Sequence, residues 1–287
     1  MRGWAVALAL ALAVLTAGSA AAAPPGLQGF IRVSNGTFVD DGWVSLNSVA
    51  ADAAYSLPDG SAALADNVQN DVVSLFQEAQ TSGFNAVRLF AHGGDVNFQL
   101  QVSPGKYNES VFRGIDYILA LAGKYQVKYL AWAHIALEYQ DTFWTSKEVR
   151  DMIKDHFSVV VNRRNMFTGK LYKEDDTIFA WDIYNVLAAG RYWSAKIGQD
   201  FQAQHAFPSI DYTTIHLWPD NWETQDPDFP RTWIEAHDRA SAAMGKPLVL
   251  EEFGKGQGKN ATYQAVYDTL QDSLARNGSF KGALFWR

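Results

Sequence analysis

The sequence predicts an α/β fold, namely a (β/α)8 TIM barrel from which the fifth strand and the last helix are missing. Short apolar runs typical of strands alternate with longer amphipathic segments, which is the pattern of a parallel sheet covered by helices. Seven strand-like runs are found, whereas a (β/α)8 barrel needs eight. These expected strands cover residues 43–49, 85–90, 127–133, 177–185, 212–218, 248–253 and 282–286.

Four of the segments between the strands carry apolar residues at helical spacing. Residues three or four positions apart lie on one side of a helix, so each stripe should pack against the sheet. The stripes run through residues 68–79, 111–122, 149–160 and 266–274. We expect them to be structural and assign them no function.

The missing strand has a definite location in the chain. Between Asn185, at the end of the fourth expected strand, and Tyr212, at the start of the next, only 26 residues intervene. That length holds about one helix with its loops, while a helix, a strand and a second helix would need roughly twice as many residues. The chain ends at Arg287, directly after the last expected strand, so we expect the helix over that strand to be missing too.

The amino terminus has the pattern of a secretory signal. Met1 and Arg2 are followed by an uncharged apolar run from Ala5 to Leu15 and by small residues up to Ala23. Since this run has 11 residues, well short of the ~20 needed to cross a membrane, we expect a cleaved signal peptide (residues 1–23) and no membrane anchor. Residues 24–287 should form a single domain of a secreted, extracellular protein.

Composition excludes several classes of function. The net charge is −7, with 24 Lys and Arg against 31 Asp and Glu, so no basic stripe is available for a nucleic acid. Cysteine is absent, which removes disulfides, zinc–thiolate sites and cysteine nucleophiles. No His-Glu-x-x-His spacing, Gly-x-Ser-x-Gly elbow or glycine-rich nucleotide signature is found, so we expect no metal and no cofactor. We expect a monomer, with glycosylation sequons at Asn35, Asn108, Asn260 and Asn277.

The candidate functional residues lie at the carboxyl ends of the expected strands, where (β/α)8 barrels carry their active sites. One carboxylate, two imidazoles, a guanidinium, an amide and two aromatic rings are suited to hold a polyhydroxylated substrate around an anionic centre. In chain order these residues are Arg88, His134, Asn185, His216, Trp218, Glu252 and Trp286.

Six stretches carry a resemblance to a known family, and they follow one another in the family's order from about residue 28 to the end of the chain. They are "GFNAVRLFAHGG", "SPGKYNESVFRGIDYILA", "NMFTGKLYKEDDTIFAWDIYN", "IDYTTIHLWPDNW", "KPLVLEEFGK" and "GALFW". The sequence resembles the retaining glycosidases of glycoside hydrolase family 5, in clan A, and among them the plant-type endo-β-1,4-mannanases. The resemblance implies double-displacement hydrolysis of mannan, glucomannan or galactomannan.

The resemblance implies roles for the residues around the reaction centre. Glu252, directly before Phe253 in "EEFG", corresponds to the nucleophile, with a structural ion-pair partner as the alternative. Its neighbour Glu251 should point to the other face of an extended strand, so that only one of the two can serve. Arg88 would pair with the nucleophile and hold it ionised, although a lone arginine is more often a surface charge.

Further roles concern the substrate. His216 would join the hydrogen-bond network of the nucleophile, with a satisfied core histidine as the alternative. Trp218 stands where many relatives carry Tyr, which puts in doubt a hydroxyl bond to the nucleophile. Trp286 would be the stacking surface for the sugar, or else ordinary packing, and Asn185 would contact the sugar 2-hydroxyl. His134 does not match the Asn-Asn pair common in relatives, so we do not expect it to make their sugar contact.

The general acid/base is the group that the sequence lacks. In relatives the counterpart of Asn185 is followed by Glu-Pro, and that Glu is the acid/base, whereas here Val186 follows. One continuous deletion explains both Val186 and the missing strand. Asp182 lies further inside the strand and Glu251 is expected to face away, so neither replaces the acid. We therefore expect a mannanase-like hydrolase with little or no activity. The alternatives are a non-catalytic glycan-binding protein and a family 5 hydrolase of another β-glycan.

Overall fold

The computed structural model describes most of the chain in several separate stretches. They are residues 31–39, 46–50, 66–90, 100–132, 146–182, 200–224 and 226–286.

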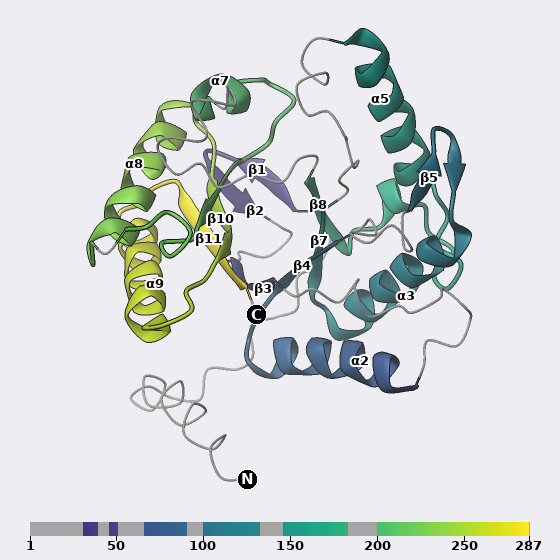
Figure 1. Ribbon diagram of the computed structural model, residues 1–287, viewed down its shortest axis with the longest axis horizontal. Helices are drawn as coiled ribbons and strands as arrows, with labels where there is room; N and C mark the ends of the chain where they lie inside the picture. The colour runs from purple at the N-terminus through teal and green to yellow at the C-terminus, as the bar shows by residue number, and fades with distance from the viewer. Residues whose placement is uncertain are drawn as a thin grey trace.

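A parallel sheet is the central feature of the described residues (Figure 1). Its strands are β3 (Leu46–Ala50), β4 (Ala86–Phe90), β7 (Lys128–Trp132), β8 (Ile178–Asp182), β9 (Thr213–Leu217), β10 (Leu248–Phe253) and β11 (Phe280–Trp286). Across the sheet they follow the order β8-β7-β4-β3-β11-β10-β9. Since β11 pairs in parallel with β3, the last strand joins the first, as it does in a closed barrel. The seven strands predicted from the sequence are confirmed.

The sheet is open where the fifth strand was predicted to be missing. β8 and β9 follow one another in the sequence, yet they form the two opposite edges of the sheet. Among the described residues, no strand lies between them. The prediction of a (β/α)8 barrel that lacks one strand therefore agrees with the topology.

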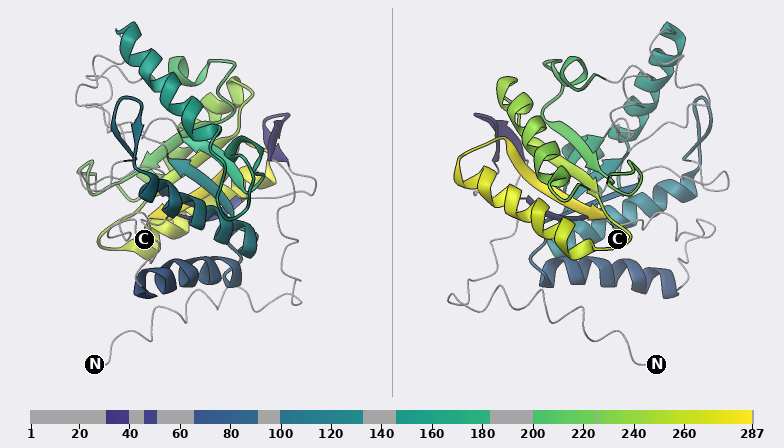
Figure 2. Two further views of the ribbon diagram at one scale, coloured as in Figure 1. Left: turned by 90° about the vertical axis from the view of Figure 1, so that its right-hand side faces the viewer. Right: turned by 60° about the vertical axis from the view of Figure 1, so that its left-hand side comes forward.

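In the described part of the chain, five long helices lie on the outside of the curved sheet (Figures 1 and 2). They are α2 (Asp66–Thr81), α3 (Glu109–Tyr125), α5 (Lys147–Val161), α8 (Phe229–Ala243) and α9 (Lys259–Ala275). α2 packs against α3, and α8 packs against α9. A short helix, α7 (Phe201–His205), precedes β9, and a 3-10 turn, η2 (Tyr172–Glu174), precedes β8. The four predicted helices are confirmed. None of the described helices combines the length and apolar character needed to cross a membrane.

Helix α8 was not predicted, and its buried face explains why. Its buried residues recur at helical spacing, but two of them, Asp238 and Ser241, are polar. Asp238 accepts hydrogen bonds from the backbone N–H groups of Ser279 and Phe280, at 2.6 and 2.8 Å from its Oδ1. A buried polar residue with such partners is stable inside a protein, yet it interrupts the apolar stripe by which a helix is recognised in a sequence.

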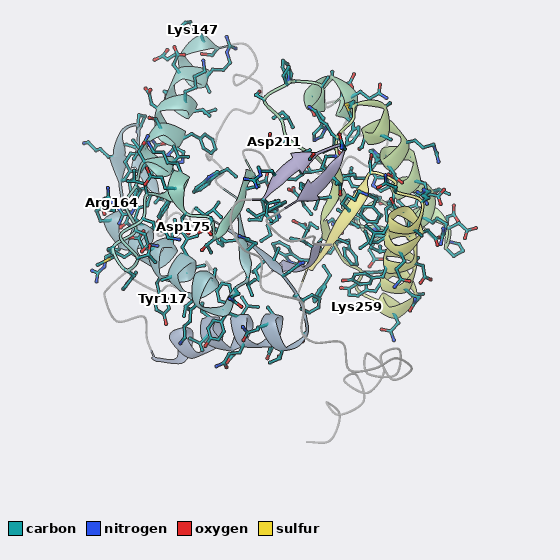
Figure 3. All side chains as sticks on the ribbon, turned by 180° about the vertical axis from the view of Figure 1, so that it is seen from behind. Tyr117, Lys147, Arg164, Asp175, Asp211 and Lys259 are labelled. Atoms are coloured by element: carbon teal, nitrogen blue, oxygen red, sulfur yellow. The ribbon has the colours of Figure 1, made fainter. Side chains whose placement is uncertain are left out.

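The interior of the barrel has its own small core, which a hairpin closes. The hairpin consists of β1 (Arg32–Ser34) and β2 (Thr37–Val39), and its Phe38 packs with inward side chains of the sheet such as Leu130 and Val249. Figure 3 shows the hairpin beside Asp211, at the amino-terminal end of β9. A second hairpin, β5 (Gln101–Ser103) and β6 (Lys106–Tyr107), lies outside the barrel next to α5.

Three aromatic rings connect the edge strand β8 with the edge strand β9 beside the β1–β2 hairpin. The Phe38 ring lies 5.2 Å from the ring of Phe179 on β8 and 5.5 Å from that of Tyr212, directly before β9. Phe179 and Tyr212 are themselves in contact, with ring centroids 5.7 Å apart. The three rings pack together across the open side of the barrel.

A histidine satisfies part of the β9 edge. The N–H of Thr213 donates to the Pro247 carbonyl, toward β10, so the N–H of Thr214 points outward. There it donates to Nε2 of His205 at 3.3 Å, while Nδ1 of His205 lies 2.8 Å from the Phe201 carbonyl. His205 therefore carries its proton on Nδ1 and supplies the acceptor that a neighbouring strand would provide.

Candidate active site

A β-bulge in β10 sets the direction of Glu251 and Glu252. Leu250 and Phe253 both pack in the core that the sheet shares with α8 and α9, although they are three positions apart. Regular alternation would place such residues on opposite faces. The register against β9 shifts between Leu250 and Glu252, as expected where one strand has an extra residue. Both glutamates can consequently face the barrel interior.

The prediction that Glu251 points away from Glu252 is wrong. Glu251 is fully buried, at 0% exposure, and its Oε1 accepts a hydrogen bond from the Tyr212 hydroxyl at 3.1 Å. Tyr212 belongs to the interior core, so Glu251 lies inside the barrel. Burial, together with the negative charge of Asp182, raises the pKa of Glu251 to about 8. The carboxyl group is therefore protonated far more readily than an ordinary glutamate.

Glu252 presents the carboxylate that a substrate can reach. Its side chain is 13% exposed, and each of its oxygens faces a donor. Nε1 of Trp218 donates to Oε1 at 2.7 Å, and Nη1 of Arg88 donates to Oε2 at 3.3 Å. Burial raises the pKa of Glu252 above its ordinary value, although Arg88 and the indole N–H offset part of this effect. The indole N–H of Trp218 thus makes the hydrogen bond to Glu252 that the hydroxyl of a tyrosine at this position was expected to make in relatives.

Arg88 joins Glu252 to a second carboxylate. The guanidinium is 1% exposed and lies between Glu252 and Asp182, at the end of β8. Nη2 and Nε of Arg88 donate to Oδ2 of Asp182 at 2.5 and 3.2 Å. Burial lowers the pKa of Arg88, but the attraction of Asp182 and the two glutamates outweighs it and leaves the pKa above its ordinary value. The arginine is a buried, bridging cation rather than a surface charge.

His216 lies beside Glu252 as a neutral ring. Its Nδ1 is 3.8 Å from Oε2 of Glu252, which is too long for a hydrogen bond. Burial and the charge of Arg88 lower the pKa of His216 well below its ordinary value, so the contact is not an ion pair. Its buried Nε2 has no hydrogen-bond partner among the described atoms.

Of the remaining predicted site residues, only Trp286 lies in the described part of the chain. Trp286 ends β11, is partly exposed and packs on the interior core, so it belongs to the same end of the barrel as Glu252. Asn185, Val186 and His134 lie outside the described residues. In the described part of the chain, no group of three His, Asp or Glu side chains could hold a metal ion.

No second carboxyl group of this cluster is placed to act as an acid. Asp182 is held as an ion by two nitrogens of Arg88. Glu251, whose pKa is raised by burial, is 0% exposed and so out of reach of a substrate. Within the described residues, the site therefore supplies one reachable carboxylate, oriented by a cation and an indole, and no proton donor opposite it.

Comparisons with known proteins identify the family. The sequence matches the family described as "GH family 5 beta-mannosidase-like" over residues 129–196 and 186–287. It is 30% identical over 346 aligned positions to mannan endo-1,4-beta-mannosidase 1 of Oryza sativa subsp. japonica, covering 90% of this chain and 78% of that protein. The chain belongs to glycoside hydrolase family 5. Mannan endo-1,4-beta-mannosidase 1 of Arabidopsis thaliana is a further relative, 27% identical over 340 positions that cover 90% of this chain and 82% of that protein.

The same comparisons indicate segments that this family 5 chain lacks. The 346 aligned positions exceed the 287 residues of the chain itself, so the relative contains positions with no counterpart here. The family match is also divided into two parts, which overlap at residues 186–196, directly after Asn185. The division of the family match agrees with a deletion after Asn185.

Solved structures of a family 5 mannosidase and of a mannanase share the fold. A family 5 mannosidase from Rhizomucor miehei matches with a TM-score of 0.73 at 22% identity, over 90% of this chain and 85% of that one. An endo-1,4-beta-D-mannanase from Thermotoga petrophila RKU-1 matches with a TM-score of 0.65 at 18% identity, over 85% and 88%. At these identities the likeness concerns the fold, and it supports the (β/α)8 barrel.

Proposed function

We propose that this family 5 glycoside hydrolase is directed at mannan-type polysaccharides, uses Glu252 as its nucleophile and lacks a general acid/base. The observation that carries the proposal is the reachable carboxylate of Glu252, which Arg88 and Trp218 orient at the carboxyl end of the barrel. The relatives named as mannan endo-1,4-beta-mannosidases support mannan as the substrate, and glucomannan and galactomannan are further candidates of the same class.

The proposed chemistry is the first half of double displacement. The Glu252 carboxylate attacks the anomeric carbon of the sugar, a new carbon–oxygen bond forms, and the bond to the leaving oxygen breaks. In the transition state Trp286 would stack on the sugar and Asn185 would contact its 2-hydroxyl. Arg88 keeps the nucleophile ionised until the bond forms.

The missing proton donor limits the reaction on natural substrates. A sugar leaving group departs as an alkoxide unless an acid protonates it, and the loss of general acid catalysis costs about 10²- to 10⁴-fold in rate. Glu251 and Asp182 do not replace this acid, because one is fully buried and the other is held by Arg88. We therefore expect very slow hydrolysis of mannan by this chain.

An activated substrate tests the nucleophile. The leaving group of a dinitrophenyl β-mannoside is a stable phenolate, which needs no protonation to depart. The folded protein should therefore release a burst of about one equivalent of phenolate and carry a mannosyl adduct on Glu252. Glu252→Gln should abolish both the burst and the adduct. Glu251→Gln is the matched control on the neighbouring residue and should retain both. A folded wild-type protein that gives neither burst nor adduct would contradict the assignment of Glu252.

A second candidate is a glycan-binding protein without catalysis. It is favoured by the lack, among the described residues, of a second carboxyl group in reach of a substrate at Glu252. Retardation of the protein in a mannan-containing gel, unchanged by Glu252→Gln and without a burst in the wild type, would support this candidate. Genomic sequence between the codons of Asn185 and Trp193 that encodes Asn-Glu-Pro and a further strand would favour the enzyme.

We also propose that the protein is secreted after removal of residues 1–23. The charged start, the apolar run and the small residues before Ala23 support this. Expression in a eukaryotic secretory host, followed by intact-mass measurement of the protein in the medium, tests it. A product that retains the first 23 residues, or that stays inside the cell, would contradict secretion.

A further inference from the structure

Gly254 lies directly against the indole that contacts Glu252. A Cβ atom at Gly254 would stand 2.6 Å from Cζ3 and 2.8 Å from Cη2 of Trp218, distances that two carbon atoms do not adopt without a shift. The backbone of Gly254 is not in the left-handed region, so alanine would fit its backbone conformation. The position excludes a side chain because of the neighbouring ring, not because of its φ angle.

The surrounding backbone restricts where the ring can move. The N–H of Gly254 donates to the Leu217 carbonyl at 3.2 Å, immediately before Trp218. Further along both segments, two residues after Gly254 and two after Trp218, the N–H of Gly256 donates to Oδ2 of Asp220 at 2.7 Å. The segments that follow β9 and β10 are therefore tied together on both sides of Trp218. A methyl group at Gly254 would displace the indole rather than separate the two segments.

The indole has one polar group, and its bond to Glu252 depends on where the ring lies. Nε1 of Trp218 is 2.7 Å from Oε1 of Glu252, a charge-assisted hydrogen bond of short length. No other hydrogen bond to this oxygen is found among the described residues, since Arg88 donates to Oε2. A small rotation of the ring would weaken the bond, because hydrogen bonds depend steeply on distance and angle.

We propose that Gly254 is a positioning residue, which seats the indole of Trp218 so that its N–H orients the Glu252 carboxylate. This inference rests on the proposed role of Glu252 as a nucleophile. Removing a hydrogen bond to a charged group has an effect of roughly 10- to 100-fold on an equilibrium. We expect Gly254→Ala to slow the burst with a dinitrophenyl β-mannoside by about 10-fold or more.

The chain offers a matched control for this substitution. Gly256 lies in the same segment, also has no left-handed φ, and a Cβ there would stand 3.4 Å from Oδ2 of Asp220. That distance is close to ordinary contact, so Gly256→Ala should leave the burst rate within about 2-fold of the wild type. Trp218→Phe is the second comparison, because it removes the N–H and the part of the ring that meets Gly254. The double variant should be no slower than Trp218→Phe alone.

A second measurement does not require activity. The pKa of the Glu252 carboxyl, followed by NMR in protein labelled with 13C-glutamate and assigned with Glu252→Gln, should rise in Gly254→Ala and in Trp218→Phe. It should not change in Gly256→Ala. This readout separates orientation of the carboxylate from a general loss of stability, and far-UV circular dichroism shows whether each variant is folded.

The outcomes separate the inference from the proposed function. An unchanged pKa of Glu252 in folded Gly254→Ala overturns the role of Gly254, whether or not the wild type reacts. A raised pKa with no burst from the wild type supports the role of Gly254 and contradicts the nucleophile. If Gly254→Ala does not fold, the steric contact is tested by the free energies of unfolding of Gly256→Ala, of Trp218→Phe and of the double variant that combines Gly254→Ala with Trp218→Phe. A double variant that folds as well as Trp218→Phe supports the steric contact, and one that remains unfolded overturns it.

Discussion

Glu251 and Glu252 are consecutive residues of one strand, yet both face the interior of the barrel. The bulge between Leu250 and Phe253 produces this arrangement. Glu252 pairs with Arg88 and is partly exposed, while Glu251 is fully buried and receives the Tyr212 hydroxyl. Burial raises the pKa of both groups, and for the fully buried Glu251 it does so to about 8.

The first prediction concerns the pH dependence of stability. The pKa of Glu251 is about 8 in the folded protein, against 4.5 as its ordinary value, so between these pH values the folded state holds a proton that the unfolded state has lost. The contribution of Glu251 to stability therefore falls as pH rises from about 4.5 to 8. Glu251→Gln has no such proton, so its free energy of unfolding should rise relative to the wild type over this range.

Urea titrations at pH 5 and pH 8 measure this difference. Glu223→Gln, at an exposed position in the loop after β9, is the matched control. If the difference between Glu251→Gln and the wild type is the same at both pH values, Glu251 is ionised throughout and the assignment is wrong.

The second prediction concerns the buried arginine. Arg88→Met leaves the carboxylates of Asp182 and Glu252 without their shared cation, and breaking a buried ion pair from one side costs about 3–5 kcal/mol. Arg231→Met is the control, since Arg231 is 40% exposed in its ion pairs with Glu235 and Asp272. A surface pair contributes about 0–1 kcal/mol. Equal free energies of unfolding for the two variants would show that the Arg88 cluster does not stabilise the fold.

The sequence predicts the barrel well because its strands follow simple rules. Each predicted strand is a short apolar run followed by a turn, and the length between Asn185 and Tyr212 locates the open side. Two features depend on tertiary contacts and escape these rules. The buried face of α8 includes Asp238, which is satisfied by the backbone of β11, and Glu251 turns inward only because of the bulge.

Part of the site was also out of reach of sequence reasoning. The apolar residues Leu250 and Phe253 at an odd spacing are a signal from which the bulge could have been inferred. No such signal exists for Gly254, whose importance comes from the ring of Trp218, directly after β9. The resemblance to family 5 names Glu252, but only coordinates show that an indole N–H meets it.

The third prediction concerns the open edge of β9. His205→Phe keeps a ring of similar size but removes the acceptor for the N–H of Thr214, so it should lower the free energy of unfolding at pH 7 by about 1–2 kcal/mol. Burial lowers the pKa of His205 below its ordinary value of 6.5, so protonation favours the unfolded state. The contribution of His205 is therefore present above about pH 6.5 and is lost as pH falls.

The difference between His205→Phe and the wild type should consequently be smaller at pH 5 than at pH 7. His237→Phe is the comparison, because His237 bonds the Trp233 carbonyl within α8 and, like His205, is partly buried. Protection of the Thr214 amide against hydrogen exchange should drop in His205→Phe alone. An amide of Thr214 that exchanges at the wild-type rate would contradict the bond to His205.

The fourth prediction concerns the leaving group. With Glu252 as the proposed nucleophile and no proton donor in reach among the described residues, the rate of the first chemical step should depend steeply on the acidity of the departing group, because no acid assists a poor one. We expect dinitrophenyl β-mannoside to react at least about 100-fold faster than methylumbelliferyl β-mannoside, and mannan to be slower still. The rate should rise with pH as Glu252 ionises, and it should show no falling limb from the loss of a general acid. Single-turnover kinetics across pH with both substrates measure these effects. Similar rates for the two aryl mannosides, or a bell-shaped profile, would place a working acid in the site.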